Sequence, residues 1–279
     1  MTTRPLTDRT VLITGGSSGI GRVTAHRLAD RGAHVVTCAR DADRLGMLAA
    51  GNARITPVVA DLTDAADRER LVDTVLATHG RIDALVNNAG IGWVGPVEEI
   101  SADAVRRLVD TNLTAVLDLT RLVLPDLLRR GAGDIVMISS AAAWFPVPGL
   151  TAYAATKAGV EGFVGGLRRE VGPRGVLVHS VNPGPVRTEW LPRSAGDRAG
   201  EDQQVTARGP GVPPEWVSRA VEQCLTRTWA RTLGVPRAVE LSRLTVIPGV
   251  NRLVDAGLGL VAPRLTTWAR QLADARTGD

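Results

Sequence analysis

The chain contains a single tyrosine and a single lysine, Tyr153 and Lys157, and these two residues lie four positions apart. Arginine replaces lysine easily on a surface, but not where a compact ammonium that can titrate is needed. On a helix, side chains four residues apart share one face, so the ammonium would lie beside the phenol. This arrangement favours the phenolate and predicts a pKa for Tyr153 below the usual value of about 10. A solvated tyrosine–lysine pair on a helix surface is the alternative interpretation.

A glycine-rich segment, TGGSSGIG at residues 14–21, follows a short β-branched run and opens a helical pattern. Glycines allow the backbone to turn tightly and to approach a pyrophosphate, and a helix start supplies free N–H groups and a positive dipole end. A tight connection between a strand and a helix, without a ligand, is the alternative. The position after the first predicted strand favours a dinucleotide site.

Short β-branched runs alternate with longer helical patterns along the chain. We predict strands at residues 10–14, 34–38, 55–60, 84–87, 134–139 and 176–181, and helices at residues 19–30, 41–50, 64–79, 101–130, 151–171 and 214–228. This alternation indicates βαβ units, and therefore an α/β, single-domain Rossmann-like fold: a doubly wound parallel sheet with helices on both faces.

The second half of the chain contains two further segments. Residues 188–214 are rich in Arg, Gly, Asp, Gln and Pro and predict a substrate lid. We place the catalytic domain at residues 1–237 and a C-terminal helical extension at residues 238–279. This extension could cover the pocket, pack on a partner subunit or lie on a membrane surface, since Arg243, Arg252, Arg264 and Arg270 alternate with apolar residues and Trp268. We expect it to pack on protein.

These motifs together resemble the short-chain dehydrogenase/reductase family, over about residues 8–190. Besides the glycine-rich segment and the Tyr–Lys pair, the resemblance rests on Asn87-Asn88-Ala89-Gly90 after the fourth predicted strand, on Asn112 within the long predicted helix, on Ser140 thirteen residues before Tyr153, and on Asn182-Pro183-Gly184 after the sixth strand. Each element is modest alone, but their order is specific.

The resemblance implies roles for four catalytic residues. Tyr153 would be the general acid that protonates a carbonyl oxygen, or the base in the reverse direction, and Ser140 would hydrogen-bond the same oxygen. Lys157 would lower the phenol pKa and hold the nicotinamide ribose, and Asn112 would hold a water that links the lysine to solvent. The alternative for Ser140 is a serine at a strand end that only hydrogen-bonds to the backbone, a role for which Ser139 is the better candidate. The alternative for Asn112 is a polar residue that only kinks its helix.

The resemblance also implies a set of cofactor-binding residues: Gly15, Ser17, Ser18, Gly19, Ile20, Gly21, Arg40, Asp61, Leu62, Asn88, Ala89, Gly90, Tyr153, Lys157, Pro183, Gly184, Val186 and Thr188. Asp61 and Leu62 would lie at the adenine ring, and Thr188 would bind the carboxamide. An NAD enzyme places a carboxylate at the end of the second strand, where this chain has Ala39. Arg40 follows and suits a 2′-phosphate, so NADP is favoured over NAD. A solvated surface arginine is the alternative.

Aromatic side chains gather in the loops that follow the predicted strands. Trp93, Trp144, Phe145 and Trp190 would form an apolar pocket with Ser140 and Tyr153 at the edge where doubly wound sheets bind ligands. We therefore predict that the substrate is a bulky hydrophobic ketone or secondary alcohol. The alternative is that the tryptophans only cover the core.

Composition narrows the range of partners and locations. The net charge is only +4 and no cluster interleaves Arg with aromatic residues, so we expect no nucleic acid partner. Cys38 and Cys224 show no metal-ligand spacing, and we expect no metal site and a reducing compartment. With a polar N-terminus and no apolar run of spanning length, the sequence predicts a cytoplasmic protein. The resemblance implies a homodimer or homotetramer formed through the helices at 101–130 and 151–171.

The leading prediction is thus an NADP-dependent oxidoreductase acting on a carbonyl/alcohol pair. The epimerase or dehydratase branch of the same superfamily has a different glycine spacing and a larger substrate domain. The non-enzymatic alternative is an NADP-binding sensor on the same fold, but such proteins tend to lose the Tyr–Lys pair. Fold alone does not decide between an enzyme and a sensor.

Overall fold

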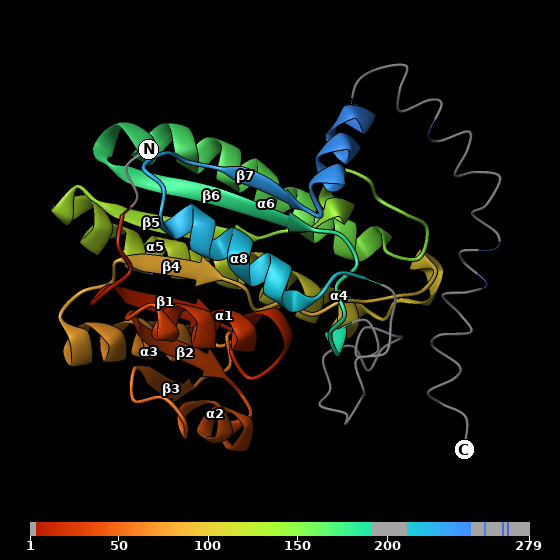
Figure 1. Ribbon diagram of the computed structural model, residues 1–279. Helices are drawn as coiled ribbons and strands as arrows, with labels where there is room; N and C mark the ends of the chain where they lie inside the picture. The colour runs from red at the N-terminus through yellow and green to blue at the C-terminus, as the bar shows by residue number, and fades with distance from the viewer. Residues whose placement is uncertain (1–3, 191–210, 247–253, 255–263, 265–266, 268–279) are drawn as a thin grey trace.

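The computed structural model describes residues 4–190, 211–246, 254, 264 and 267 of the chain (Figure 1). Seven parallel strands form one sheet in the order β3-β2-β1-β4-β5-β6-β7. The strands are β1 Thr10–Thr14, β2 His34–Ala39, β3 Ile55–Val59, β4 Ala84–Asn87, β5 Gly133–Ile138, β6 Val176–Pro183 and β7 Thr232–Val235. The order reverses between β1 and β4, and this confirms the predicted doubly wound α/β fold.

Helices cover both faces of the sheet. In Figure 1, α1 and α8 lie in front of it, and α3, α5 and α6 lie behind it. The helices are α1 Gly19–Asp30, α2 Ala42–Ala49, α3 Ala65–His79, α4 Ala102–Val109, α5 Ala115–Arg130, α6 Thr151–Val171 and α8 Pro214–Leu225. The strands β1, β4 and β5 are buried along their whole length, because each of their faces packs on a helical layer.

Helix starts follow the polar residues of the sequence. The side chains of Asp41, Asp64 and Ser101 accept hydrogen bonds from backbone N–H groups in the first turns of α2, α3 and α4. Helices α3 and α5 end at Gly80 and Gly131, both of which adopt the left-handed conformation. Local sequence therefore sets these boundaries to within about one residue of the prediction.

The prediction of one continuous helix at residues 101–130 is wrong at its centre. Residues Asp110–Thr114 form a π-helical segment, η2, between α4 and α5. The segment contains Asn112, whose buried side chain bonds to the main chain of Ile91. These bonds hold an extra residue in the turn, and bulges of this kind are frequent at functional sites.

The sequence also missed strand β7, a four-residue strand with a glycine in its interior. It pairs with β6, and the chain then enters the 3₁₀ segment η6, Arg237–Val246. Most of the predicted lid at 188–214 and most of the predicted extension at 238–279 lie outside the described residues. The described part contains no helix that is both long and apolar enough to span a lipid bilayer.

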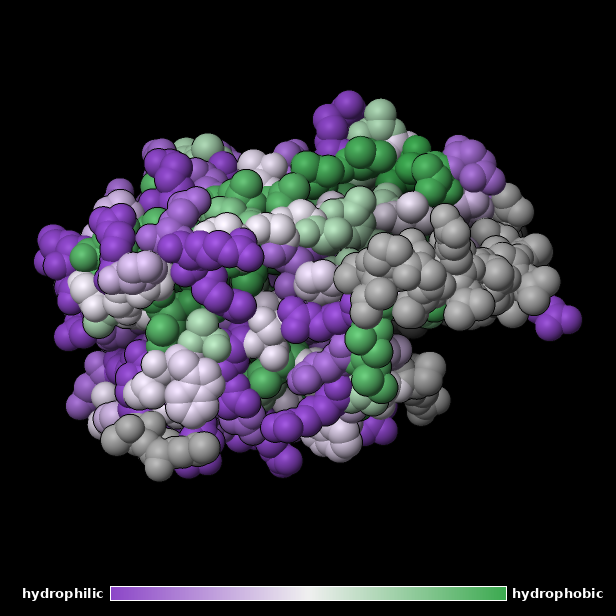
Figure 2. Space-filling model, turned by 90° about the horizontal axis from the view of Figure 1, so that it is seen from above, coloured by the Kyte–Doolittle hydropathy of each residue, from purple (hydrophilic) through white to green (hydrophobic). Residues whose placement is uncertain are grey.

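Figure 2 looks down on the side of the molecule that carries β7, α6 and η6, and shows hydrophilic and hydrophobic residues next to one another there. Exposed large apolar side chains in the segments on this side include Trp229, Leu241 and Leu244. Single exposed apolar residues of this kind are ordinary on a protein surface.

Candidate active site

Tyr153 and Lys157 lie on the first turns of α6 and both are buried. The ammonium of Lys157 is 5.8 Å from the centroid of the Tyr153 ring. Lys157 Nζ also donates to the backbone oxygen of Ile138, the last residue of β5, over 2.9 Å. The pair therefore belongs to the carboxyl edge of the sheet rather than to a solvated helix surface.

The pKa of Tyr153 differs from the sequence prediction. Burial raises the pKa of Tyr153 to about 12, and the hydrogen bond with Ser140 offsets only part of that shift. Burial also lowers the pKa of Lys157 to about 8, against the negative charge of Glu161. The sequence prediction of a lowered Tyr153 pKa is therefore corrected. Loss of hydration raises the pKa of the phenol by more than the Lys157 ammonium lowers it, because that ammonium is directed at the Ile138 carbonyl.

Asn112 joins the π segment to helix α6 and to the loop after β4. Its side chain accepts from Ile91 N at 2.9 Å and donates to Ile91 O at 2.8 Å and to Thr156 Oγ1 at 3.1 Å. A Cβ on Gly90 would lie 3.3 Å from Asn112 Oδ1 and 3.5 Å from Lys157 Nζ. The structure therefore brings Asn112 and Lys157 to the same side of Gly90.

The two serines that end β5 have different contacts. Ser140 hydrogen-bonds with Tyr153, and its Oγ also accepts from Ala142 N at 3.1 Å. Ser139 is buried and its Oγ donates to the backbone oxygen of Lys157 at 3.4 Å. Ser140 therefore places a hydroxyl beside the phenol, whereas Ser139 satisfies backbone.

The glycine-rich loop is packed tightly against its neighbours. A Cβ on Gly16 would lie 1.9 Å from Thr37 Oγ1, and a Cβ on Gly21 would lie 2.1 Å from the backbone oxygen of Gly15. Asn88 Nδ2 donates to the backbone oxygens of Thr14 at 2.8 Å and of Gly15 at 3.2 Å. The loop after β1 and the loop after β4 are thus locked together at the point where the strand order reverses.

The start of α1 fits a dinucleotide phosphate. Ser18 occupies the N-cap position in an extended conformation, and its side chain makes no capping hydrogen bond. Free N–H groups and the positive helix dipole are therefore available at this end. Gly19 faces Thr188, whose Cγ2 would be 3.3 Å from a Cβ placed on the glycine. The chain after β6 therefore passes over the helix start.

The predicted 2′-phosphate residue, Arg40, is exposed at the end of β2. Asp41, next to it, caps α2 and pairs with Arg44 at 3.1 Å. Arg44 also pairs with Glu189 at 3.2 Å, which links the start of α2 to the chain after β6. Two guanidinium groups therefore lie close in sequence at this edge.

The remaining predicted cofactor residues occupy the ends of β3 and β6. Asp61 Oδ1 accepts from Thr63 N at 2.9 Å, and the buried Leu62 follows it. After β6, Gly184 N donates to Val235 O at 2.9 Å, and Val186 forms a parallel bridge with Val212. The two sides of the predicted lid are held together by this bridge.

The aromatic residues predicted to line the pocket differ in whether they contact Tyr153. Trp190 packs on Tyr153 with ring centroids 4.8 Å apart, and the buried Trp93 belongs to the same apolar cluster. Trp144 instead lies under the guanidinium of Arg243, 5.0 Å from its ring centroid, so the segment η6 covers it. Phe145 is half-buried on the same loop, and its N–H donates to Ala141 O.

Several residues of this site were missed from the sequence. Thr156 and Glu161 were missed entirely, and both are buried on α6. Asn182 and Thr14 lie within the predicted motifs, but no role was predicted for them. Asn182 is buried in β6, and Thr14 Oγ1 accepts from the backbone N–H groups of Asn88 and Ala89. The sequence could have indicated these residues, because they are polar residues at positions expected to be buried, and buried polar groups need hydrogen-bond partners.

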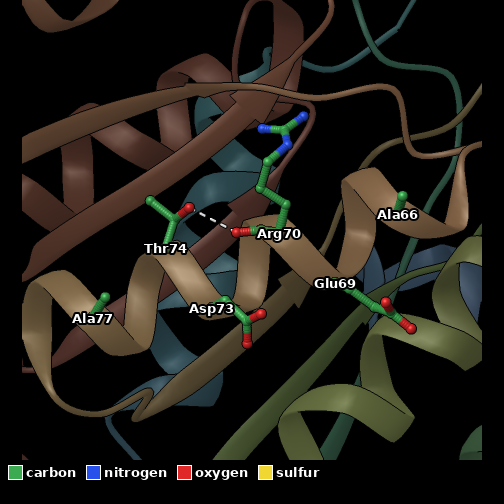
Figure 3. A pocket seen from close by; sticks show the side chains of 6 residues that line it. All are labelled: Ala66, Glu69, Arg70, Asp73, Thr74 and Ala77. Atoms are coloured by element: carbon green, nitrogen blue, oxygen red, sulfur yellow. Dashed lines mark hydrogen bonds between the residues drawn. The ribbon is translucent and has the colours of Figure 1, made fainter.

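A separate surface depression lies along α3, as Figure 3 shows. Its lining comes from one helix: Ala66, Glu69, Arg70, Asp73, Thr74 and Ala77. Within it, Thr74 Oγ1 donates to the backbone oxygen of Arg70 at 2.6 Å. The depression includes none of the residues around Tyr153, so we place the chemistry at the sheet edge.

Comparison with known proteins agrees with this geometry. A family model described as short chain dehydrogenase matches residues 9–198. Dehydrogenase/reductase SDR family member 4 of Oryctolagus cuniculus is 33% identical over 219 residues, covering 76% of this chain and 84% of that protein. Sulfoacetaldehyde reductase 2 of Chromohalobacter salexigens is 34% identical over 244 residues, covering 85% of this chain and 93% of that protein.

Solved structures share the fold. A short-chain dehydrogenase from Streptomyces avermitilis has a TM-score of 0.74 and 30% identity, covering 98% of this chain and all of that chain. The 3-ketoacyl-(acyl-carrier-protein) reductase from Brucella melitensis, solved with NADH, has a TM-score of 0.73 and 26% identity, covering 84% of this chain and 99% of that chain.

Proposed function

The chain is an NAD(P)-dependent oxidoreductase of the short-chain dehydrogenase/reductase family, and we propose that it uses NADPH to reduce a bulky hydrophobic ketone, or NADP to oxidise the corresponding alcohol. The observation that carries the proposal is the hydrogen bond between Ser140 and Tyr153, beside Lys157, in a buried apolar cluster. The nicotinamide cofactor supplies or accepts the hydride when it is bound.

The residues of the site can manage the proton and the developing charge. Because burial keeps the phenol of Tyr153 protonated at neutral pH, it can donate its proton to the carbonyl oxygen. Ser140 donates a hydrogen bond to the same oxygen, and Lys157 provides the positive charge that stabilises the phenolate left behind. Asn112, held by Ile91 and Thr156, supports the proton path to solvent.

NADP preference rests on the chemistry at the end of β2. Ala39 presents no carboxylate to a ribose hydroxyl, and Arg40 supplies a guanidinium that binds phosphate oxygens in pairs. The main chain of the glycine-rich loop and the uncapped start of α1 would hold the diphosphate. The Brucella melitensis reductase was solved with NADH, so cofactor choice needs its own test.

The substrate class rests on the aromatic lining. Trp93 and Trp190 pack around Tyr153 and would exclude water from the reacting oxygen. The bridge between Val186 and Val212 supports a lid that closes over this pocket, within a catalytic domain at residues 1–237. We also propose that η6 packs the start of the 238–279 extension on this domain, since Thr245 Oγ1 donates to Trp144 O.

Assembly and location complete the proposal. Three exposed apolar side chains on neighbouring helices, Val105 and Val109 on α4 and Leu117 on α5, support a homodimer or homotetramer. Free and buried Cys38 and Cys224 support a reducing, cytoplasmic location. We expect no nucleic acid partner and no metal.

The test is oxidation of NADPH, followed at 340 nm with a panel of bulky aromatic ketones, in the unaltered protein and in Tyr153→Phe. Phenylalanine preserves the buried ring but removes the proton, so turnover should fall by about 10² to 10⁴-fold. NADPH binding, followed by fluorescence, should persist in the variant. Phe163→Leu, on the same helix but away from the site, serves as the control for folding.

Two results would overturn the proposal. Equal turnover in Tyr153→Phe would remove Tyr153 from the chemistry. NADPH binding without turnover of any ketone or alcohol would favour a cofactor-binding sensor on the same fold, because the binding residues would then act without the catalytic ones.

A further inference from the structure

Glu161 is a buried carboxylate on the catalytic helix, one turn beyond Lys157. Positions four residues apart on a helix share a face, so the two side chains lie on the buried side of α6. A carboxylate is rarely buried unless its charge is compensated or its oxygens are hydrogen-bonded. The residues that contact the Glu161 carboxylate therefore indicate the role of its negative charge.

Two polar residues of β6 contact this carboxylate. With its side-chain amide oriented so that the nitrogen faces acceptor oxygens, Asn182 donates to Glu161 Oε1 at 3.0 Å and to the backbone oxygen of Ser140 at 3.2 Å. Ser180 Oγ lies between them, in contact with Glu161 and 2.9 Å from Asn182 Oδ1. Asn182 therefore fixes the position of Glu161 relative to the strand end that carries the catalytic serine.

The charge of Glu161 acts on cations of its own helix. Burial lowers the pKa of Lys157 to about 8, and the negative charge of Glu161 opposes this shift. Burial likewise lowers the pKa of Arg168, and Glu161 again opposes the shift. Within residues 4–190 and 211–246, Glu161 forms no direct ion pair, so its effect on both cations is exerted at longer range.

The other groups that the structure describes around Lys157 carry no charge at neutral pH. They are the phenol of Tyr153 on α6, the amide of Asn112 on η2, the backbone oxygen of Ile138 on β5 and the main chain of Gly90 after β4. Among the described titratable groups, Glu161 is the one whose charge stabilises the ammonium.

We propose that Glu161 is a positioning residue of the active site: its carboxylate, fixed by Asn182 and Ser180, keeps the charged form of Lys157 beside Tyr153. This inference rests on the proposed function only in assigning Lys157 to catalysis. Its physical content, a carboxylate that stabilises a buried ammonium, can be measured without substrate or cofactor.

The unique lysine makes that measurement direct. Protein labelled with [ε-¹³C]lysine gives one resonance from this chain, and its chemical shift can be followed from pH 6 to 11. We expect a midpoint near pH 8 in the unaltered protein, and a midpoint lower by about one pH unit in Glu161→Gln. Glu170→Gln, an exposed glutamate on the same helix, should leave the midpoint unchanged.

Activity provides a second measurement. With NADPH and an aromatic ketone, kcat at pH 8 should fall about fivefold in Glu161→Gln, because the charged fraction of Lys157 drops from about one half to about one tenth. The loss should diminish at pH 6, where the lysine is charged in both proteins. A variant that only loosens the structure would lose activity equally at both pH values.

The inference is overturned if Glu161→Gln and Glu170→Gln titrate at the same midpoint. Should Glu161→Gln fail to fold, Glu161→Met removes the charge with an apolar side chain of similar volume and should show the same lowered midpoint. An active Tyr153→Phe variant would contradict the proposed function but not the inference about Glu161, since the lysine titration is independent of turnover.

Discussion

Single residues determine the chemistry of this protein. The one tyrosine and the one lysine of the chain are both buried, and burial shifts the pKa of each away from the value of a solvated side chain. The phenol is therefore an acid that holds its proton at neutral pH. A lysine whose pKa is about 8 stays mostly charged there, so the pair is suited to donating a proton to a carbonyl.

The proposed preference for NADP also depends on a single side chain, Arg40. We expect Arg40→Gln to weaken NADPH binding by about 10 to 100-fold while NADH binding changes little, because one charge-assisted pair of hydrogen bonds to the 2′-phosphate is lost. Fluorescence titration with both cofactors measures this. Arg174→Gln, an exposed arginine before β6, is the matched control. Equal weakening for NADH and NADPH would contradict a phosphate-specific role.

At the scale of elements, the site depends on close approach between loops. The glycine-rich loop contacts the loop after β4 through Asn88, and the π segment η2 turns Asn112 toward the same loop. Backbone atoms occupy the space in which side chains would otherwise lie. Packing within the protein therefore requires glycine at these positions, independently of any bound phosphate.

Two glycine substitutions separate these effects. Gly21→Ala would place a Cβ 2.1 Å from the backbone oxygen of Gly15, so we expect it to lower the free energy of unfolding by about 3 kcal/mol and to abolish NADPH binding. Gly46→Ala, at an exposed position of α2 with nothing within 4 Å of the added Cβ, should raise that free energy by about 0.5 to 1 kcal/mol. Urea unfolding measures both changes in free energy. An unchanged free energy of unfolding in Gly21→Ala would contradict the close contact between Gly21 and the backbone oxygen of Gly15.

At the scale of the whole molecule, a buried charge cluster joins distant parts of the chain at the opposite end of the strands. Asp134 accepts from Arg4 at 2.5 Å, pairs with Arg9 and lies 3.1 Å from His179 Nε2. His179 Nδ1 accepts from Arg231 N at 3.2 Å. The cluster connects the N-terminal segment, β5, β6 and the start of β7, and both partners of the Asp134–His179 pair are fully buried.

This cluster predicts how stability depends on pH. Burial lowers the pKa of His179, and Asp134 only partly opposes the shift. The unfolded chain therefore takes up a proton near pH 6.5 that the folded chain does not, so stability falls by up to about 1.4 kcal/mol per pH unit below about pH 6.5. His179→Gln should flatten this slope in urea unfolding between pH 5 and 7.

The exposed His26 provides the control for this prediction, since His26→Gln should keep the slope of the unaltered protein. His79, whose pKa is also lowered by burial, contributes a slope of the same sign in every variant. An unchanged slope in His179→Gln would show that His179 does not remain neutral in the folded protein at these pH values.

The sequence by itself determined the strand–helix alternation, the glycine-rich loop and the order of the motifs, because β-branched runs, caps and glycines act over a few neighbouring residues. It therefore predicted the doubly wound sheet and six of its strands. It missed β7, whose four residues carry no distinctive pattern and which forms because β6 offers it an open edge. It also missed the π segment, which depends on Ile91 bonding to Asn112 across the fold.

Only the tertiary structure decided the electrostatics of the site. Spacing places Lys157 near Tyr153, but the direction of the Tyr153 pKa shift depends on how much water the surrounding loops exclude. The partners of Glu161 come from β6, some twenty residues away in the chain, so no local pattern indicates them. Short-range chemistry can be predicted from residue types, whereas burial and long-range contacts exist only once the sheet and helices have packed.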